Sequence, residues 1–122
     1  MQHVRLPPRA IRAEINERLH DFFAEHDTAD FREAVRLIVQ HYGVTRPLVR
    51  WRRSIDRHQT LGLTYSSNRV HLYQPKHWVE RPEGERSERE WIQTFWHEMY
   101  HVLTIVREEE RADYFARLAM ED

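Results

Sequence analysis

The spacing of the apolar residues changes along this chain, and that change limits the folds that it can adopt. In the first third, apolar residues recur three or four positions apart, which places them on one face of a helix. The two resulting stripes are Ile11, Ile15, Leu19 and Phe22, then Phe31, Val35, Ile38, Val39 and Tyr42. Asp27 or Thr28 can cap the second helix, and Gly43 can end it. We therefore predict a pair of helices over residues 9–43.

Between residues 47 and 73 apolar and polar residues alternate, which is the period of a β-strand. The three alternating segments are "PLVRWRR", "TLGLTY" and "RVHLY". In the last of them Val70 and Leu72 share one face, and His71 and Tyr73 share the other. The polar residues 66–68 between the last two segments predict a hairpin turn. The middle of the chain therefore predicts a small sheet of about three strands.

The helical period returns towards the C-terminus. Residues 75–86 contain two prolines and a glycine and predict a surface loop. Ser87 and Glu90 form a capping box at the start of the next helix. The segment "EEERADYFARLAM" predicts a last helix near residues 108–120. Helices and strands in this order predict an α+β fold, and the length of 122 residues predicts one domain over residues 1–122.

Composition excludes several classes of protein. There is no cysteine, so disulfides and thiolate metal sites are excluded. The net charge of −1 does not suggest a nucleic-acid or membrane partner. No segment approaches the ~20 apolar residues that span a bilayer, and the first residues lack the apolar run of a signal peptide. We therefore expect no membrane partner and a cytoplasmic location.

The stretch "TFWHEMYHVL", residues 94–103, contains the most specific motif of the chain. His97 and His101 are four residues apart, so a helix places both on one face, where they can reach one ion about 2 Å away. Glu98 is rotated by roughly 100° from His97. It is therefore poorly placed as a ligand but can reach a water molecule on the ion, as in zinc hydrolases.

The same motif can arise by chance in a chain with nine histidines. The alternative interpretation is an exposed helical turn with two solvated histidines. Uncharged neighbours argue against that alternative, because Met99, Tyr100, Val102 and Leu103 indicate a partly buried turn. Buried polar rings need partners, since their desolvation is costly. A shared metal ion would provide one partner for both rings.

These residues resemble two known patterns. Thr94 to Leu103 is similar at every position to the extended signature of zincin metallopeptidases. The segment that follows resembles the ImmA/IrrE-like zinc peptidases, in a small phage-type variant. The matching residues are Ala112, Asp113, Phe115, Ala116, Leu118 and Met120. The resemblance covers roughly residues 60–120 and implies a minimal zincin-like fold. It also implies a zinc-dependent endopeptidase that cuts a specific protein, with Glu98 as general base on a zinc-bound water.

The resemblance also implies the third metal ligand. In that family the ligand is a glutamate four residues before the Asp/Asn position, which here is Glu109 before Asp113. Asp113 would then accept the free ring N–H of a ligating histidine. A straight helix would put Glu109 ~12 Å from His101 along the axis. We therefore predict a turn within residues 104–108 and two helices, near 88–104 and 108–120. Without that turn, the third ligand would be His71, Glu110 or Asp113.

Further residues leave alternatives open. The strand with His71 and Tyr73 could pair with an extended substrate through a free edge, or simply expose one face. Tyr65, Tyr73 or His71 could donate to an oxyanion. The arginines in and around the first predicted strand could contact phosphates or form a solvated face. These arginines are Arg46, Arg50, Arg52, Arg53 and Arg57. The alternatives to an ImmA/IrrE-like peptidase are a non-catalytic zinc-binding interaction module and a DNA-associated peptidase of SprT-like character.

Overall fold

The computed structural model describes residues 4–52, 62–66, 69–80, 87–104 and 109–121. The described chain is a mixture of helices and strands, which is compatible with the predicted α+β class. The elements in chain order are α1 (Arg9–Glu25), α2 (Thr28–Tyr42), β1 (Leu48–Arg52), β2 (Gly62–Ser66), β3 (Arg69–Tyr73), α3 (Pro75–Trp78), α4 (Glu88–Leu103) and α5 (Glu109–Ala119). None of the helices in these ranges is long and apolar enough to cross a membrane.

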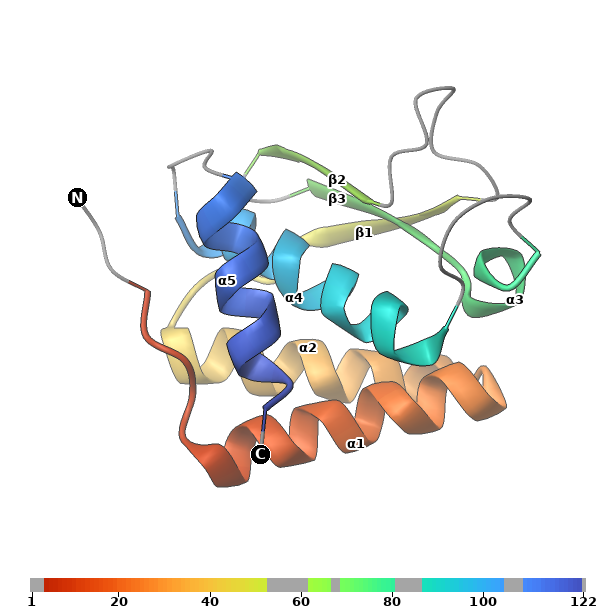
Figure 1. Cartoon of the computed structure of the whole chain (residues 1–122), viewed down its shortest axis with the longest axis horizontal. Coiled ribbons are helices and arrows are strands. Elements are labelled where there is room, and N and C mark those ends of the chain that lie inside the picture. Colours follow the sequence, from red (N-terminus) through yellow and green to blue (C-terminus); the bar gives the residue numbers. More distant parts are fainter. Residues whose placement is uncertain (1–3, 53–61, 67–68, 81–86, 105–108, 122) are drawn as a thin grey trace.

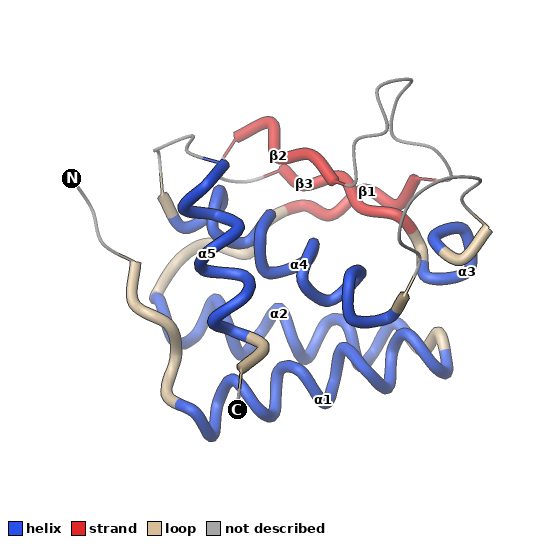
Figure 2. Tube along the Cα trace, in the orientation of Figure 1, coloured by secondary structure: helices blue, strands red, loops and turns tan. Residues whose placement is uncertain are grey.

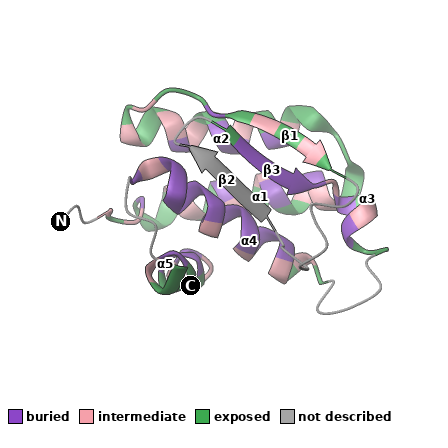
Figure 3. Ribbon diagram, turned by 90° about the horizontal axis from the view of Figure 1, so that it is seen from above, coloured by how far each residue is buried: buried purple, intermediate pink, exposed green. Residues whose placement is uncertain are grey.

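Helix α4 runs through the middle of the molecule. Figures 1 and 2 show the sheet on one side of α4 and the α1–α2 pair on the other. Helix α4 contacts β2, β3, α1 and α5, and most of its residues are buried (Figure 3). Its first turn is capped as predicted, because the side chain of Ser87 accepts a hydrogen bond from the backbone N–H of Glu90. The motif of residues 94–103 therefore lies in a largely buried helix.

The helical pair also matches its sequence pattern. The Asp27 side chain caps α2 by accepting from Ala29 N at 2.9 Å, and Gly43 ends α2 in the left-handed conformation, with φ of 63°. The apolar stripes meet the sheet and α4 in a cluster of aromatic rings. Phe31 lies at its centre, with its ring centroid 4.7 Å from that of Trp51 and 5.7 Å from that of Phe95.

Among the described residues the sheet has three strands, as predicted, in the order β1-β3-β2. β3 pairs in parallel with β1 and antiparallel with β2. The predicted turn residues 67 and 68 lie outside the described part of the chain. The proposed free edge of the strand with His71 is wrong, because β3 is the central strand. The exposed-face alternative is also wrong, since both His71 and Tyr73 are buried.

The predicted loop over residues 75–86 needs a correction. Its first part is a short helix, α3, with Pro75 at the start and Trp78 buried. Proline is well suited to the first turn of a helix because that turn needs no N–H from it. The Trp78 Nε1–H donates to the carbonyl of Ser87 at 3.0 Å, which links α3 to the start of α4. Residues 81–86 lie outside the described part.

Candidate functional site

The site begins with the two histidines of α4. His97 and His101 lie on one helical face, and their ring centroids are 5.0 Å apart. The side chain of His101 is only 3% exposed, whereas that of His97 is 16% exposed. Burial limits the rotamers of both rings, because the surrounding residues of α4 are packed in the core. The helix therefore presents two imidazoles as a fixed pair.

Helix α4 ends at Leu103, and helix α5 then crosses it (Figures 1 and 3). Thr104 ends α4 with extended backbone angles, φ −140° and ψ 150°, so the helix does not continue. Helix α5 then begins at Glu109. The two helices near the predicted bounds are thus confirmed, and Thr104 is the β-branched residue at which the first one stops. Residues 105–108, which complete the predicted turn, lie outside the described part.

Glu109 reaches both histidines. Its Oε2 lies 2.6 Å from His97 Nε2, and its Oε1 lies 3.2 Å from His101 Nε2. One carboxylate thus bridges the two rings from the opposite helix. Burial opposes ionisation of Glu109, but the charges of His97 and His101 and their hydrogen bonds hold its pKa below the ordinary value. The bridging group is therefore a carboxylate, which is the form that can bind a cation.

Asp113 holds the other side of the His97 ring. Its Oδ1 lies 2.7 Å from His97 Nδ1. Asp113 is one turn after Glu109 on α5, so both carboxylates come from the same helical face. A carboxylate accepts the Nδ1–H, and this directs the Nε2 atom of the ring towards Glu109 and His101.

Glu98 follows His97 and is buried, although it is acidic. Its Oε2 lies 4.0 Å from His97 Nε2. The carboxylate thus stands beside the nitrogen that faces Glu109, as the helical rotation between neighbouring residues predicts. Burial of a carboxylate costs free energy unless charged or hydrogen-bonding groups compensate the lost hydration.

The group fits a divalent metal ion of the zinc type. One ligand atom from each of His97, His101 and Glu109 lies within 4.8 Å of the others. Two imidazole nitrogens and one carboxylate oxygen form a ligand set that catalytic zinc uses, with one position left for water or substrate. An ion held by these three atoms would lie about 2 Å from each of them. The carboxylates are exposed, 69% for Glu109 and 62% for Asp113, so the group is open to solvent.

The other candidate ligands lie elsewhere. Among the described residues, neither His71 nor Glu110 belongs to a group that could hold a metal ion. His71 accepts a hydrogen bond from Arg52 Nε at 3.4 Å, and burial together with Arg52, Arg50 and Arg69 lowers its pKa. Glu110 instead lines a polar cavity of about 620 Å³ beside Asp113, together with Gln93 and Arg117.

The candidate donors to an oxyanion are less well placed. The ring of Tyr73 packs against that of Trp78, with centroids 5.9 Å apart. The side chain of Tyr65 lies outside the described part. Tyr100, which we did not predict as part of the site, lies near the pair, with its ring centroid 6.0 Å from that of His101.

A supporting residue comes from the far end of the chain. Asn16 of α1 accepts a hydrogen bond from Trp96 Nε1 at 2.7 Å and donates to the carbonyl of Ala119 at 3.0 Å. One side chain thus joins α1, α4 and the end of α5. No sequence signal points to it, because its partners are 80 and 103 residues away.

Comparison of the chain with protein-family models, with curated proteins and with solved structures finds no match. The function must therefore be inferred from the chemistry of the site itself.

Proposed function

We propose that this protein is a zinc-dependent endopeptidase with a minimal zincin-like fold, similar to the ImmA/IrrE-like peptidases. The observation that carries the proposal is the position of Glu109, whose carboxylate oxygens lie 2.6 Å and 3.2 Å from the Nε2 atoms of His97 and His101. A glutamate eight residues after the second histidine reaches this place only because α5 packs across α4, with its first turn beside the two histidines. The ligand set expected for catalytic zinc is then complete.

His97, His101 and Glu109 are the residues that would hold the metal. A zinc ion held there would supply a Lewis acid that lowers the pKa of water and polarises a peptide carbonyl. Asp113 keeps the Nδ1–H of His97 engaged, so that the lone pair of Nε2 is directed at the common point between the ligands. Burial of His101 keeps that ring in place.

Glu98 would act as the general base. Its buried carboxylate stands beside the ligand face, where it can accept a proton from the attacking water. The water oxygen forms a bond to the peptide carbonyl carbon, and the C–N bond of the peptide then breaks. The same carboxyl group can return the proton to the departing amine nitrogen. Proton transfer of this kind contributes about 10²–10⁴ in rate.

The substrate class follows from the site and from the resemblance. The polar cavity beside Asp113 offers space for a peptide segment next to the ligand group. The resemblance to ImmA/IrrE-like peptidases favours one specific protein over general digestion. We therefore propose a protein substrate whose cleaved segment reaches the exposed side of Glu109 and Asp113.

The deciding experiment replaces the proposed base without changing its shape. Glu98→Gln keeps the size of the side chain but cannot accept a proton. The variant should bind zinc and fold as the unaltered protein does, and it should lose cleavage of a broad peptide library by at least about 10²-fold. Glu14→Gln, at an exposed position of α1, makes the same chemical change away from the site and should cleave normally. Cleavage by Glu98→Gln at the unaltered rate would exclude Glu98 as the base.

A non-catalytic zinc-binding module is the second candidate. One observation favours it: both ring nitrogens of His97 contact carboxylates, at 2.6 Å and 2.7 Å, so the cluster also fastens α5 to α4. Such a module would bind zinc and gain stability from it, but the Glu98→Gln change would alter no activity. Zinc binding with no cleavage of any peptide in the library by the unaltered protein would favour this candidate.

A further inference from the structure

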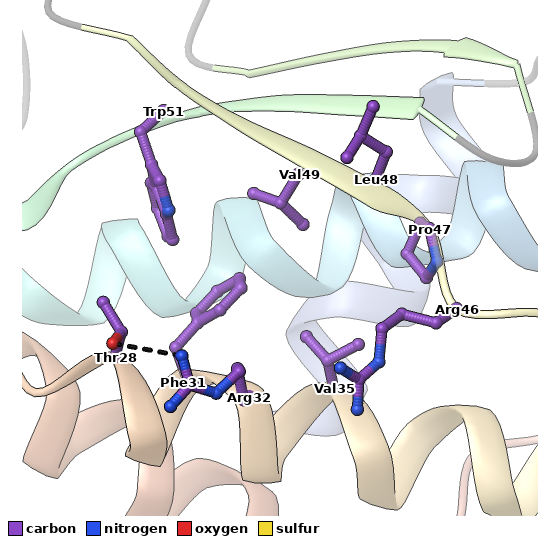
Figure 4. Close-up of a pocket in the computed structure, with 9 residues that line it drawn as sticks. All are labelled: Thr28, Phe31, Arg32, Val35, Arg46, Pro47, Leu48, Val49 and Trp51. Carbon is purple, nitrogen blue, oxygen red and sulfur yellow. Dashed lines mark hydrogen bonds between the residues drawn. The ribbon is translucent and has the colours of Figure 1, made fainter.

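A second site lies at the opposite edge of the molecule from α5, between α2 and β1 (Figure 3). It is a pocket of about 310 Å³, which is within the range of ligand-binding pockets. Its lining residues are Thr28, Phe31, Arg32, Val35, Arg46, Pro47, Leu48, Val49 and Trp51. Figure 4 shows Val49 and Trp51 pointing from β1 towards α2, and Phe31 and Val35 pointing back from α2. These four side chains make an apolar floor.

The rim of the pocket is positively charged. Arg32 and Arg46 are exposed and line the pocket, and no acidic residue in the described part of the chain does. Within the described ranges, neither arginine forms an ion pair with a carboxylate; Arg32 contacts only Thr28 Oγ1, at 3.4 Å. An apolar floor beneath two guanidinium groups is complementary to a ligand that has apolar groups and carboxylates.

The other face of β1 is also basic. Residues alternate between the two faces of a strand, so Arg50 and Arg52 point away from the pocket that Val49 and Trp51 line. The register places Arg50 opposite His71, and Leu48 opposite Arg69, so Arg69 lies on this outer face as well. Arg50, Arg52 and Arg69 are exposed. Arginines thus lie on both sides of β1: Arg32 and Arg46 at the pocket, and Arg50, Arg52 and Arg69 on the outer face.

β1 is also an edge strand. Among the described strands it pairs only with β3, so one side of its backbone has no strand partner there. The pocket opens between this strand and α2 (Figure 4). An extended peptide can hydrogen-bond to such an edge and direct every second side chain into an adjoining pocket. Leu48, which is 52% exposed, adds an apolar contact at the start of the strand.

We propose that the free edge of β1 and the pocket between α2 and β1 bind an extended segment of a partner protein in which apolar residues alternate with Asp or Glu. Apolar side chains of the segment enter the pocket over Phe31 and Val49. The acidic side chains between them face Arg50 and Arg52, and a carboxylate near the pocket mouth meets Arg46. This site does not depend on the peptidase proposal, because it shares no residue with the metal-binding group.

The pocket favours a peptide over a nucleic acid. A nucleic acid uses arginines for its phosphates and needs exposed aromatic faces for its bases. Here Phe31 is buried, and its ring meets that of Trp51 at 4.7 Å in an edge-to-face contact inside the fold. An apolar floor of this kind offers nothing to a phosphate backbone, whereas it suits Val, Ile or Leu side chains.

The test uses a short capped peptide in which glutamate and valine alternate. Its affinity for the full chain is measured by titration, and amide chemical shifts locate the contact. We expect shifts at residues 31–35 and 46–52. Two further peptides have the same side chains. One carries the valines in a single block, and the other keeps the alternating order but is N-methylated at alternate backbone amides. Both should bind about tenfold more weakly, since one loses the side-chain alternation and the other loses strand pairing.

Protein variants locate the contact independently. Arg46→Glu should weaken the alternating peptide at least about tenfold, as expected for a lost charge-assisted hydrogen bond. Arg9→Glu changes the net charge equally at an exposed residue of α1, which does not line the pocket, and should change affinity little. Thr28→Trp places a large side chain at the exposed mouth of the pocket and should also block the peptide.

The proposal would be overturned by any of the following results. The block peptide could bind as well as the alternating one, which would show that the order of the side chains does not matter. The N-methylated peptide could also bind equally well, which would exclude backbone pairing with β1. Either result would leave attraction between net charges as the explanation of binding. A single-stranded oligodeoxynucleotide could bind more tightly than the peptide and shift the same amides, which would make this a nucleic-acid surface. Finally, the alternating peptide could cause no shifts at residues 31–35 and 46–52.

Discussion

His97 and Asp113 are joined by a contact of 2.7 Å between Nδ1 and Oδ1, across the two helices of the candidate metal site. This contact selects the ring nitrogen that faces Glu109 and His101. It also explains why one turn of α5 carries two carboxylates towards α4: one faces the common point of the ligands, and the other holds a ligand in place.

Removal of the Asp113 carboxylate should weaken zinc binding without abolishing it. Asp113→Ala should lower the affinity about 10–100-fold, the usual effect of losing a partner of a metal-binding histidine. Asp113→Asn keeps an oxygen acceptor and should have a smaller effect. Competition with a chelator of known affinity gives the values. Glu110→Ala, at the neighbouring exposed acid, serves as the control, and an equal loss there would mean that only net charge matters.

Zinc should bind at one ion per chain and stabilise the fold. At a free concentration 100 times the Kd, the gain is about 2.7 kcal/mol. The variants His97→Ala, His101→Ala and Glu109→Ala should lose this gain in thermal unfolding. His41→Ala, which removes an exposed histidine of α2, should keep it. A metal-free unaltered protein in the presence of excess zinc would refute both the peptidase and the zinc-binding module.

Asn16 should contribute measurably to stability and to the site. Asn16→Leu leaves the Nε1–H of the buried Trp96 without its acceptor, at a cost of about 1–3 kcal/mol. Asn16→Asp retains that acceptor, but its carboxylate would face the Ala119 carbonyl at the end of α5 and repel it, so this variant should be destabilised as well. Urea unfolding measures both. If Asn16→Leu unfolds at the same urea concentration as the unaltered protein, the bridge between α1, α4 and α5 is unimportant.

The contact between His20 and Glu88 should make stability depend on pH. Both carboxylate oxygens of Glu88 approach His20 Nδ1, at 2.8 Å and 2.9 Å. The hydrogen bond and the charge of Glu88 raise the pKa of His20, with smaller support from Asp21 and Glu17. The stabilisation is therefore complete below the unfolded-state pKa of about 6.5 and is lost as pH rises through the folded-state pKa.

The measurement for this contact compares His20→Gln with the unaltered protein at several pH values. Both residues are partly exposed, so the difference in unfolding free energy at low pH should be only about 0.2–1 kcal/mol. It should shrink at alkaline pH. His26→Gln, an exposed histidine between α1 and α2, provides the control. A difference that grows with pH would contradict the assignment.

Several features followed from local sequence alone. The helical period and the Ser87 cap predicted α4, and the spacing of four residues predicted that His97 and His101 share a face. These predictions depend only on neighbours within one or two turns, whose distances the helix itself sets. The alternating segments predicted three strands for the same reason. The role of the metal group in peptide cleavage stays a prediction.

Other features were decided by tertiary packing. Periodicity could not give the order β1-β3-β2 or show that β3 is buried on both faces, because strand order depends on which segments meet. The sequence could not distinguish the short helix α3 from a loop, because proline is common both in loops and in the first turn of a helix.

The choice of Glu109 over Glu110, Asp113 and His71 also belongs to the tertiary structure. No glycine or proline between residues 104 and 108 marks a turn, so local preference alone does not specify one. The direction of α5 follows from its buried face, which consists of Ala112, Phe115, Ala116 and Ala119. That face packs on α4, with the ring centroid of Phe115 6.0 Å from that of Trp96. Burial of this apolar face stabilises the fold by more free energy than any single turn residue contributes. It thereby places Glu109 beside His97 and His101, which the sequence predicted to share one helical face.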